Sequence, residues 1–226
     1  MDIETWMLIY KEILSDFGYD EHKDRISCSY LSENICKVDL SGLLDRFRSS
    51  VITVVGNADN LQKEISCVTG TVICAGSSIS RYIEMRGLPD IIVTDLDHGI
   101  DPFIESLKNG KVGVIHAHGD NLDMIREFPF SNSYHIIGTC QCLPYPNTMN
   151  FGGFTDGDRA VILADYLDSP RINIVGFDFD HPAKGSSPLK ARKLKWAKRI
   201  IAMVYESRLE KYGKDNIIQG GKTFRP

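Results

Sequence analysis

The sequence predicts a doubly wound α/β fold with a mainly parallel sheet, and three observations support this prediction. Beyond residue 50, short runs rich in β-branched residues alternate with segments in which apolar residues recur at three- and four-residue steps. The short runs are nearly uniformly apolar, which is typical of strands buried on both faces of a sheet. Nearly every run ends in a glycine or a carboxylate, at the positions where open parallel sheets bind their ligands.

The composition is that of a folded globular protein. Of the 226 residues, 42% are hydrophobic and 25% are charged, which excludes disordered, coiled-coil and collagen-like architectures. A net charge of −4 argues against a basic surface that wraps nucleic acid, and no apolar run approaches the ~18 residues of a membrane span. The six cysteines are scattered, and the first residues lack the pattern of a secretory signal. We therefore expect a cytoplasmic protein with reduced thiols and with neither nucleic acid nor a membrane as a partner.

The chain is predicted to divide into an N-terminal helical segment, residues 1–45, and an α/β domain, residues 46–226. Apolar spacing predicts an amphipathic helix over 3–17, which Gly18 ends, and a short helix over 40–47. Between them the pattern is weak and polar. An exposed apolar face on the first helix is compatible with a homodimer.

Within the α/β domain the elements alternate. Strands are predicted at 51–55, 71–75, 91–94, 112–117, 134–139 and 172–177, and helices at 61–65, 100–107, 122–128 and 160–167. A long final helix has Ser187 as N-cap, Pro188 in its first turn and Gly213 past its end. Its first three turns carry many basic residues, Arg192 and Lys193 among them. This positive charge indicates either a bound anion or an ordinary solvated helix face.

Two small-residue turns follow predicted strands. Gly56 and Asn57 follow the first strand, and Gly76 and Ser77 follow the second. Glycine lets backbone N–H groups approach a phosphate at a helix N-terminus, but without a GxGxxG or Walker motif a plain tight turn is the alternative. On the phosphate interpretation, we expect Asn57, Gly76 and Ser77 in a nucleotide pocket.

Carboxylates follow the next two strands. Asp95 and Asp97 are two residues apart, so in an extended chain they point the same way, and Asp120 and Asp123 follow the fourth strand. Clustered carboxylates repel one another and imply a counter-ion. Hard oxygen ligands beside a phosphate suit Mg²⁺ best.

Histidines and cysteines near these loops raise the question of zinc. His116 and His118 lack a third nitrogen or sulfur ligand at a recognisable spacing, so we expect them to hydrogen-bond phosphate or substrate, or the backbone. Cys140 and Cys142 are one residue apart, and no second pair completes a four-ligand set. Ordinary small core residues are the favoured interpretation of this pair.

Two further loops carry candidate ligand-binding residues. Residues 150–159 contain three glycines and a capping Thr155 or Asp156 before a helix, with Phe154 offering a flat surface for a heterocycle. The alternative is a well-capped helix start with core phenylalanines. Residues 181–187 contain Lys184 and suit a lid over phosphates, although a plain loop is equally compatible.

These motifs resemble a known group of enzymes. Residues 89–97 and 116–121 are similar to the paired acidic motifs of thiamine pyrophosphokinases, which hold Mg²⁺ and ATP. The closer resemblance is to archaeal 6-hydroxymethyl-7,8-dihydropterin pyrophosphokinases, through residues 153–160 and 176–179 as well. The resemblance covers most of the chain and implies a thiamine pyrophosphokinase-like catalytic fold.

Two departures from the pattern of the thiamine enzymes weaken the thiamine assignment. Leu122 separates Asn121 from Asp123 and so spreads the acids, and the turn at Gly76 and Ser77 lacks the acidic residue that the thiamine enzymes tend to carry.

The resemblance implies attack by a hydroxymethyl oxygen on the β-phosphorus of ATP, with release of AMP and formation of a diphosphate ester, in tetrahydrofolate- or methanopterin-type pterin biosynthesis. The implied partners are therefore ATP and a small heterocyclic alcohol. The expected roles fall into groups: Asp95, Asp97 and Asp120 on Mg²⁺; Asp123 orienting the nucleophile or a metal-bound water; Lys184, Arg192 and Lys193 on the phosphates; Asn57, Gly76, Ser77, His118 and Asn121 in the nucleotide pocket; Phe154, Thr155, Asp156 and Asp158 on the pterin.

Three alternatives stay open at this point. A thiamine pyrophosphokinase would consume a different acceptor with ATP. A nucleotide-sugar-dependent transferase would use the same carboxylates without releasing AMP, and a non-catalytic nucleotide sensor would bind ATP without turnover.

Overall fold

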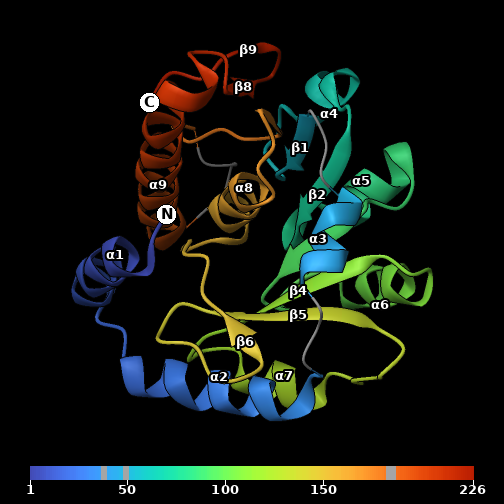
Figure 1. The fold of residues 1–226 in the computed structure, drawn as a ribbon, viewed down its shortest axis with the longest axis vertical. Helices are drawn as coiled ribbons and strands as arrows, with labels where there is room; N and C mark the ends of the chain where they lie inside the picture. The colour runs from blue at the N-terminus through green and yellow to red at the C-terminus, as the bar shows by residue number, and fades with distance from the viewer. Residues whose placement is uncertain (37–39, 48–50, 182–186) are drawn as a thin grey trace.

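The computed structural model describes residues 1–36, 40–47, 51–181 and 187–226, and within them nine strands form one sheet (Figure 1). The strand order is β6-β5-β4-β3-β2-β1-β7-β8-β9, and every neighbouring pair is parallel except β8 and β9. The strands are β1 Val51–Val55, β2 Thr71–Ala75, β3 Ile91–Thr94, β4 Val112–Ala117, β5 His135–Cys140, β6 Thr148–Met149, β7 Arg171–Val175, β8 Ile217–Gln219 and β9 Lys222–Thr223. The predicted doubly wound α/β class is confirmed.

Helices pack against both faces of this sheet. Figure 1 shows α8 with α9 on one side and α5 with α6 on the other. The α-helices are α1 Ile3–Phe17, α2 Glu21–Asn34, α3 Leu40–Phe47, α4 Leu61–Glu64, α5 Ile79–Arg86, α6 Ile100–Lys108, α7 Leu122–Glu127, α8 Asp156–Tyr166 and α9 Pro188–Tyr212; two 3-10 turns are η1 Ile65–Cys67 and η2 Gly76–Ser78. No helix among the described residues combines the length and apolarity needed to cross a bilayer.

The strand order reverses at β1, which has β2 on one side and β7 on the other. Gly56 follows β1 and Gly176 follows β7, and the two turns pack so closely that a Cβ on Gly176 would lie 2.4 Å from the carbonyl oxygen of Gly56. Gly176 also has a φ of +72°, a conformation that L side chains rarely adopt. Both turns therefore need glycine, and they leave a crevice at the switch point where doubly wound folds bind ligands.

The N-terminal helices pack on the sheet domain. Helix α1 begins at Asp2, whose carboxylate accepts a hydrogen bond from the Thr5 N–H at 2.8 Å, and ends at Gly18, as predicted. Trp6 is buried, and its indole N–H donates to the Gln141 carbonyl at 2.8 Å. Helix α2 contacts β4, β5 and α7 at the lower end of the molecule in Figure 1.

Helix α2 was not among the predicted elements, because its buried face is mostly polar. Asp24, Ser27, Cys28 and Ser32 are buried on it, so the apolar spacing that identifies a surface helix is weak. Helix α5 and the short strands β6, β8 and β9 were also not predicted. The predicted strands are present within one or two residues at each end.

The capping predicted for α9 is confirmed. The Ser187 hydroxyl accepts from the Lys190 N–H at 3.2 Å, Pro188 lies in the first turn, and Gly213 ends the helix with a φ of +74°. Part of the basic face contacts α1: the Arg192 guanidinium lies 2.8 Å from the Asp16 carboxylate. The Arg199 guanidinium lies 2.6 Å from Glu12.

Candidate active site

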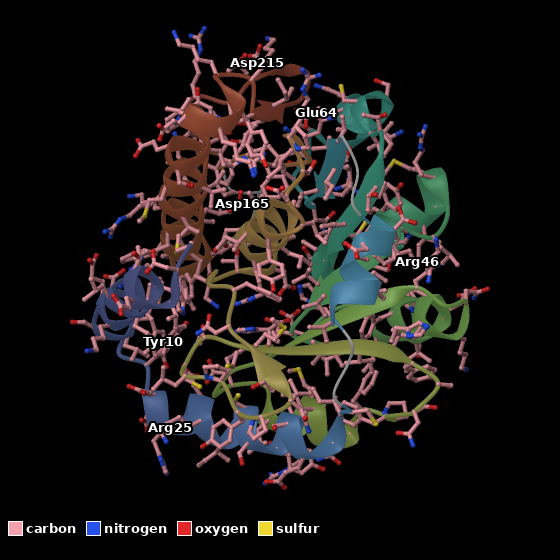
Figure 2. All side chains as sticks on the ribbon, viewed as in Figure 1. Tyr10, Arg25, Arg46, Glu64, Asp165 and Asp215 are labelled. Carbon is pink, nitrogen blue, oxygen red and sulfur yellow. The ribbon has the colours of Figure 1, made fainter. Side chains whose placement is uncertain are left out.

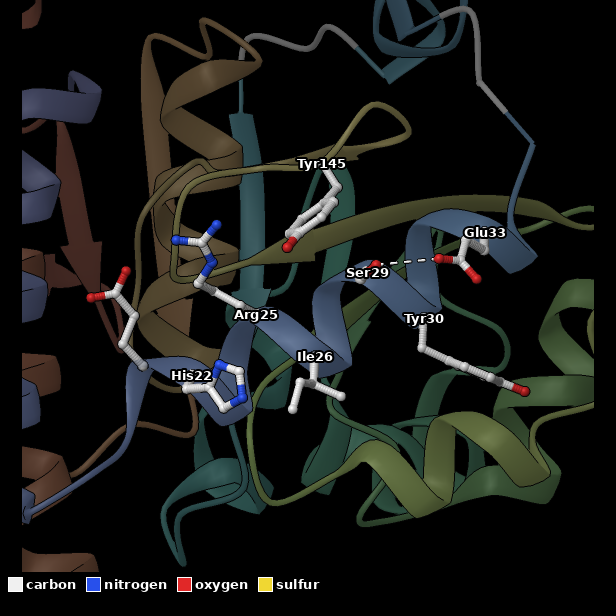
Figure 3. A pocket seen from close by; sticks show the side chains of 8 residues that line it. His22, Arg25, Ile26, Ser29, Tyr30, Glu33 and Tyr145 are labelled. Atoms are coloured by element: carbon white, nitrogen blue, oxygen red, sulfur yellow. Dashed lines mark hydrogen bonds between the residues drawn. The ribbon is translucent and has the colours of Figure 1, made fainter.

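A cleft of about 670 Å³ opens at the carboxyl edge of the sheet, at the switch point between β1 and β7. The loops after β1, β3, β4 and β7 line it, together with the first turn of α8, the first turns of α9 and the loop between α1 and α2. A second hollow, lined by α2 and Tyr145, lies apart from these loops (Figure 3). Neither of the two possible metal-ligand clusters among the described residues lies in that second hollow, so the carboxylate chemistry belongs to the cleft.

Three carboxylates meet in the cleft. Asp95 and Asp97 follow β3, Asp156 begins α8, and ligand oxygens of all three lie within 4.8 Å of one another. Such an oxygen-only group has the donor chemistry that Mg²⁺ prefers, so the residues fit this ion. Asp156 was predicted to contact substrate and Asp120 to bind the metal. The structure instead brings Asp156 into this group.

The backbone between the first two carboxylates differs from the extended chain that we expected. Leu96 has a φ of +70°, in the left-handed region, and its N–H donates to the Thr94 hydroxyl at 2.9 Å. The Asp97 N–H in turn faces the Asp95 carboxylate at 3.3 Å. This conformation costs about 1–2 kcal/mol for a non-glycine residue. Asp95 and Asp97 are close together as predicted, but a tight turn holds them there.

Asp156 is positioned by two neighbours, Gly76 and Arg159. Gly76 packs closely against its carboxylate, since a Cβ at position 76 would lie 2.8 Å from Asp156 Oδ2. Arg159, one turn further along α8, places Nη1 3.3 Å from Asp156 Oδ1 and donates from Nη2 to the Gly153 carbonyl at 3.1 Å. The Arg159 side chain is buried, at 3% exposure, and the Asp156 side chain is mostly covered, at 14%. Gly76 is therefore required for the close approach of the β2 turn to the α8 carboxylate.

Crowding of the carboxylates separates their pKa values. Partial burial and the neighbouring Asp95 carboxylate raise the pKa of Asp97 to about 6. Burial and the charge of Asp95 raise the pKa of Asp156 well above its usual value. Burial opposes ionisation of Asp95 too, but hydrogen bonds from His118 and Asp97 hold the pKa of Asp95 well below its usual range. Like charges so close together are the pattern expected where a cation binds.

The histidines belong to the β4 end of the site. His118 Nε2 lies 3.5 Å from Asp95 Oδ2. His116 is buried, its Nδ1 lies 3.1 Å from the Thr139 hydroxyl, and burial lowers its pKa well below the usual histidine value. His118 thus faces the carboxylate group, while His116 is a neutral side chain of the wall.

Asn121, predicted to bind nucleotide, connects two strand ends instead. Its buried side-chain amide donates to the Asp95 carbonyl at 2.8 Å and to the His116 carbonyl at 2.6 Å. These hydrogen bonds fix the loop after β3 against the loop after β4 and so position Asp95.

Asp24 is a cleft residue that sequence reasoning missed. Its carboxylate accepts from the Gly119 N–H at 2.6 Å, from the Gln141 amide at 2.8 Å and from the Tyr10 hydroxyl at 2.5 Å. Tyr10 on α1 is labelled in Figure 2. Burial and the adjacent Asp24 raise the pKa of Tyr10, which keeps the phenol protonated as a donor. Asp24 thereby joins α1, α2 and the loop that follows β4.

Aromatic side chains form one wall of the cleft. The Phe154 ring lies 5.0 Å from Phe17 and 6.4 Å from Tyr19, centroid to centroid, and the Lys193 ammonium lies 5.6 Å above the Phe154 ring. All four residues line the cleft. This wall combines a flat apolar surface with a positive charge.

The predicted site residues divide into three sets. Those that line the cleft are Asn57, Ser77, Asp95, Asp97, His118, Asp120, Phe154, Thr155, Asp156 and Lys193. Those directed elsewhere are Gly76, which supports Asp156, and Asn121, Asp123, Asp158 and Arg192. Lys184 lies outside the described residues.

Three of these placements have a clear local cause. Asp123 lies in the first turn of α7, has a side chain 90% exposed and pairs with Arg126 at 3.1 Å. Asp158 is buried in a capping box, where it accepts from the Phe154 and Thr155 N–H groups at 2.7 and 2.8 Å. Arg192 packs over the Phe17 ring at 4.6 Å and pairs with Asp16.

Comparison with known proteins gives consistent matches. Residues 30–184 match the model of a family described as 6-hydroxymethylpterin diphosphokinase MptE-like. A protein of Methanothermobacter thermautotrophicus named 6-hydroxymethyl-7,8-dihydropterin pyrophosphokinase is 38% identical over 223 residues, covering 89% of this chain and 94% of the relative. Relatives of the same name from Pyrococcus furiosus and Methanocaldococcus jannaschii are 34% and 31% identical, each over 89% of this chain and over 93% and 95% of their own lengths.

Proposed function

The chain belongs to the 6-hydroxymethylpterin diphosphokinase MptE-like family, and from this premise we propose that it transfers a diphosphate group from ATP to the hydroxymethyl oxygen of 6-hydroxymethyl-7,8-dihydropterin, releasing AMP. The acceptor and the reaction class follow the names of the relatives. The donor, the metal and the AMP product are our own assignment. The convergence of Asp95, Asp97 and Asp156 in the switch-point cleft is the observation that carries it.

We assign Mg²⁺ to these three carboxylates. When bound, the ion would neutralise charge on the phosphate oxygens, which is the main requirement of phosphoryl-type transfer. The protein's part is to hold the carboxylates in place: Arg159 and the close packing of Gly76 orient Asp156, and Asn121 fixes the backbone at Asp95.

The remaining phosphate charge is assigned to α9 and the glycine turns. Lys190 and Lys193 line the cleft from the first turns of α9, and Gly56 and Asn57 line it from the loop after β1. Their ammonium groups would attract the polyphosphate into the cleft. Asn57 is held by the Arg81 guanidinium, which donates to its side-chain oxygen at 2.8 Å.

The aromatic wall suits the heterocyclic acceptor. A pterin ring stacked on Phe154, beside Phe17 and Tyr19, would lie on the same side of the cleft as Asp156, two residues along the chain. Its hydroxymethyl group could then approach the phosphates held by the carboxylates. Positioning of this kind, together with charge neutralisation, supplies most of the catalysis in a transfer that needs no covalent catalyst.

An AMP-release assay tests the proposal. Purified protein is incubated with ATP and Mg²⁺ and with either 6-hydroxymethyl-7,8-dihydropterin or thiamine, and AMP and the diphosphate ester are quantified. We expect AMP that depends on the pterin and matches the ester in amount. If AMP release depends on thiamine instead, thiamine is the acceptor and the pterin assignment is wrong. If the protein binds ATP but releases AMP with neither acceptor, the proposed reaction is overturned.

A further inference from the structure

Three buried cysteines from distant parts of the chain meet beside the cleft. Cys28 lies on α2, Cys140 is the last residue of β5, and Cys142 follows in the next turn. All three are buried, none forms a disulfide, and their Sγ atoms lie within 4.8 Å of one another. The sequence indicated only the pair at 140 and 142; the fold supplies the third sulfur.

We propose that Cys28, Cys140 and Cys142 bind a soft metal ion in three-coordinate geometry, and that Cu(I) is the ion that fits best. Thiolate sulfur is the ligand type that selects Cu(I) over the hard cations that carboxylates prefer. The protein would thus have two metal sites that differ in ligand type. Asp95, Asp97 and Asp156 offer oxygen ligands that suit Mg²⁺, and the three cysteines offer sulfur ligands that suit Cu(I). The proposal does not depend on the proposed function.

The donor set argues against zinc. Among the described residues no histidine or carboxylate joins the three sulfurs, whereas structural zinc almost always takes four cysteine or histidine ligands. The other polar atoms in contact are the Thr148 hydroxyl, 3.3 Å from Cys28 Sγ, the Cys142 and Met149 carbonyls, 3.4 and 3.8 Å from Cys140 Sγ, and the Leu143 carbonyl, 3.5 Å from Cys142 Sγ. None of these is a preferred ligand of either ion, so the sulfurs define the site.

Positively charged side chains near the three cysteines can offset the negative charge of a Cu(I)–thiolate complex. Binding of Cu(I) by three thiols would release three protons to solvent and leave a complex of charge −2, with the copper oxidation state unchanged. Arg25 acts electrostatically on Cys142 and Arg159 on Cys140, while Asp24 near Cys142 opposes them. Figure 3 shows Arg25 projecting from α2 near Tyr145. Two nearby guanidinium groups lower the cost of burying such an anion.

Ordinary packing of small apolar thiols is the competing explanation, and it predicts no special affinity. The test is an anaerobic titration of the reduced full-length protein with Cu(I) against a competing chelator such as bicinchoninate. We expect one ion per chain that the chelator removes only at high concentration. The same result should hold for a Cys36→Ser, Cys67→Ser variant, which lacks the two cysteines that are not fully buried.

Substitution of single cysteines tests whether Cu(I) binds at this cluster. Cys28→Ser should weaken Cu(I) binding by at least the ~10–100-fold that loss of even an outer-sphere partner costs a metal site. Cys74→Ser is the matched control, because Cys74 is equally buried on β2 but outside the cluster. Equal affinity in wild type and Cys28→Ser, or equal loss in both variants, would overturn the proposal.

A second measurement covers the case in which a variant fails to fold. X-ray absorption at the copper edge of the wild-type complex should show three sulfur neighbours and no nitrogen or oxygen. Two sulfurs, or a mixed shell, would contradict a site made of these three cysteines.

Discussion

Asp156 and Arg159 form an ion pair one turn apart at the start of α8, with Oδ1 of the carboxylate 3.3 Å from Nη1 of the guanidinium. The guanidinium also donates to the Gly153 carbonyl. This pair connects the capped entrance of the helix to the carboxylate group, so the structure that begins α8 also sets the geometry of the candidate metal site.

Removal of Arg159 should destabilise the protein and weaken the site together. Arg159→Gln leaves Asp156 without its cation, and because Asp156 is only partly exposed and can protonate, the loss of unfolding free energy should be at most about 3–5 kcal/mol, the cost of a broken buried pair. Urea denaturation of Arg159→Gln, Asp156→Asn and the double variant measures it. The double variant should be much less unstable than the sum of the single variants; additive losses would show that the two side chains act independently.

Asp97→Asn should reduce turnover roughly 10²–10³-fold, the cost typical of losing one group that stabilises charge in the reaction. The melting temperature should change little, because the Asp97 side chain is 45% exposed. Asp101→Asn is the control, since Asp101 is an exposed first-turn carboxylate of α6 outside the cleft. If Asp97→Asn turns over as fast as Asp101→Asn, Asp97 does not bind the metal.

Metal affinity should distinguish Asp156 from Asp120. Asp156→Asn removes one of the three clustered carboxylates, whereas Asp120 is exposed, lines the cleft and does not belong to the cluster. Calorimetric titration with Mg²⁺ in the presence of ATP should show weaker binding for Asp156→Asn and near wild-type binding for Asp120→Asn. If Asp120→Asn weakens Mg²⁺ binding and Asp156→Asn does not, the metal ligands are Asp95, Asp97 and Asp120, as expected from the sequence.

Gly176→Ala should lower both stability and activity. The added Cβ would collide with the Gly56 carbonyl at the crossing of the β1 and β7 turns, in addition to the strain of a positive φ. Gly18→Ala is the matched control, because Gly18 has a similar φ of +68° but no atom within 4 Å of the added Cβ. The control should lose only the ~1–2 kcal/mol of a left-handed non-glycine residue. If Gly176→Ala loses no more unfolding free energy than this, the backbone of the two turns can shift to make room for the added Cβ.

His116 should make stability depend on pH. Burial lowers the pKa of His116 in the folded protein, so its contribution is fully present above the unfolded-state pKa of about 6.5 and is lost as the pH falls below that value. Relative to His116→Gln, the wild type should lose up to about 1.4 kcal/mol per pH unit between pH 6.5 and 5. Urea denaturation at several pH values measures this difference, and a constant difference would mean that folded His116 titrates normally.

Much of the fold and part of the site could be predicted from the sequence. The uniformly apolar strands and the caps at Ser187 and Gly213 are local signals, and the structure confirms them. The resemblance to the pterin pyrophosphokinase family, inferred from residues 89–97, 116–121, 153–160 and 176–179, is confirmed by the family match. The proximity of Asp95 and Asp97 followed from their position after one strand.

The missing parts depend on contacts between distant segments. No local pattern shows that the first turn of α8 approaches the end of β3, so Asp156 could not be grouped with Asp95. Asp24 could not be predicted as a cleft residue, because its polar partners, Tyr10 and the Gly119 N–H, come from other elements. Asp123 lies near Asp120 in sequence, but the start of α7 turns its side chain to solvent.

The two edge strands of the sheet, β6 and β9, span two residues each within the described chain. Long exposed edges are templates on which other chains can add strands and aggregate, and very short ones offer few unpaired backbone groups for this. The parallel sheet that builds the cleft is thereby protected from growing by strand addition.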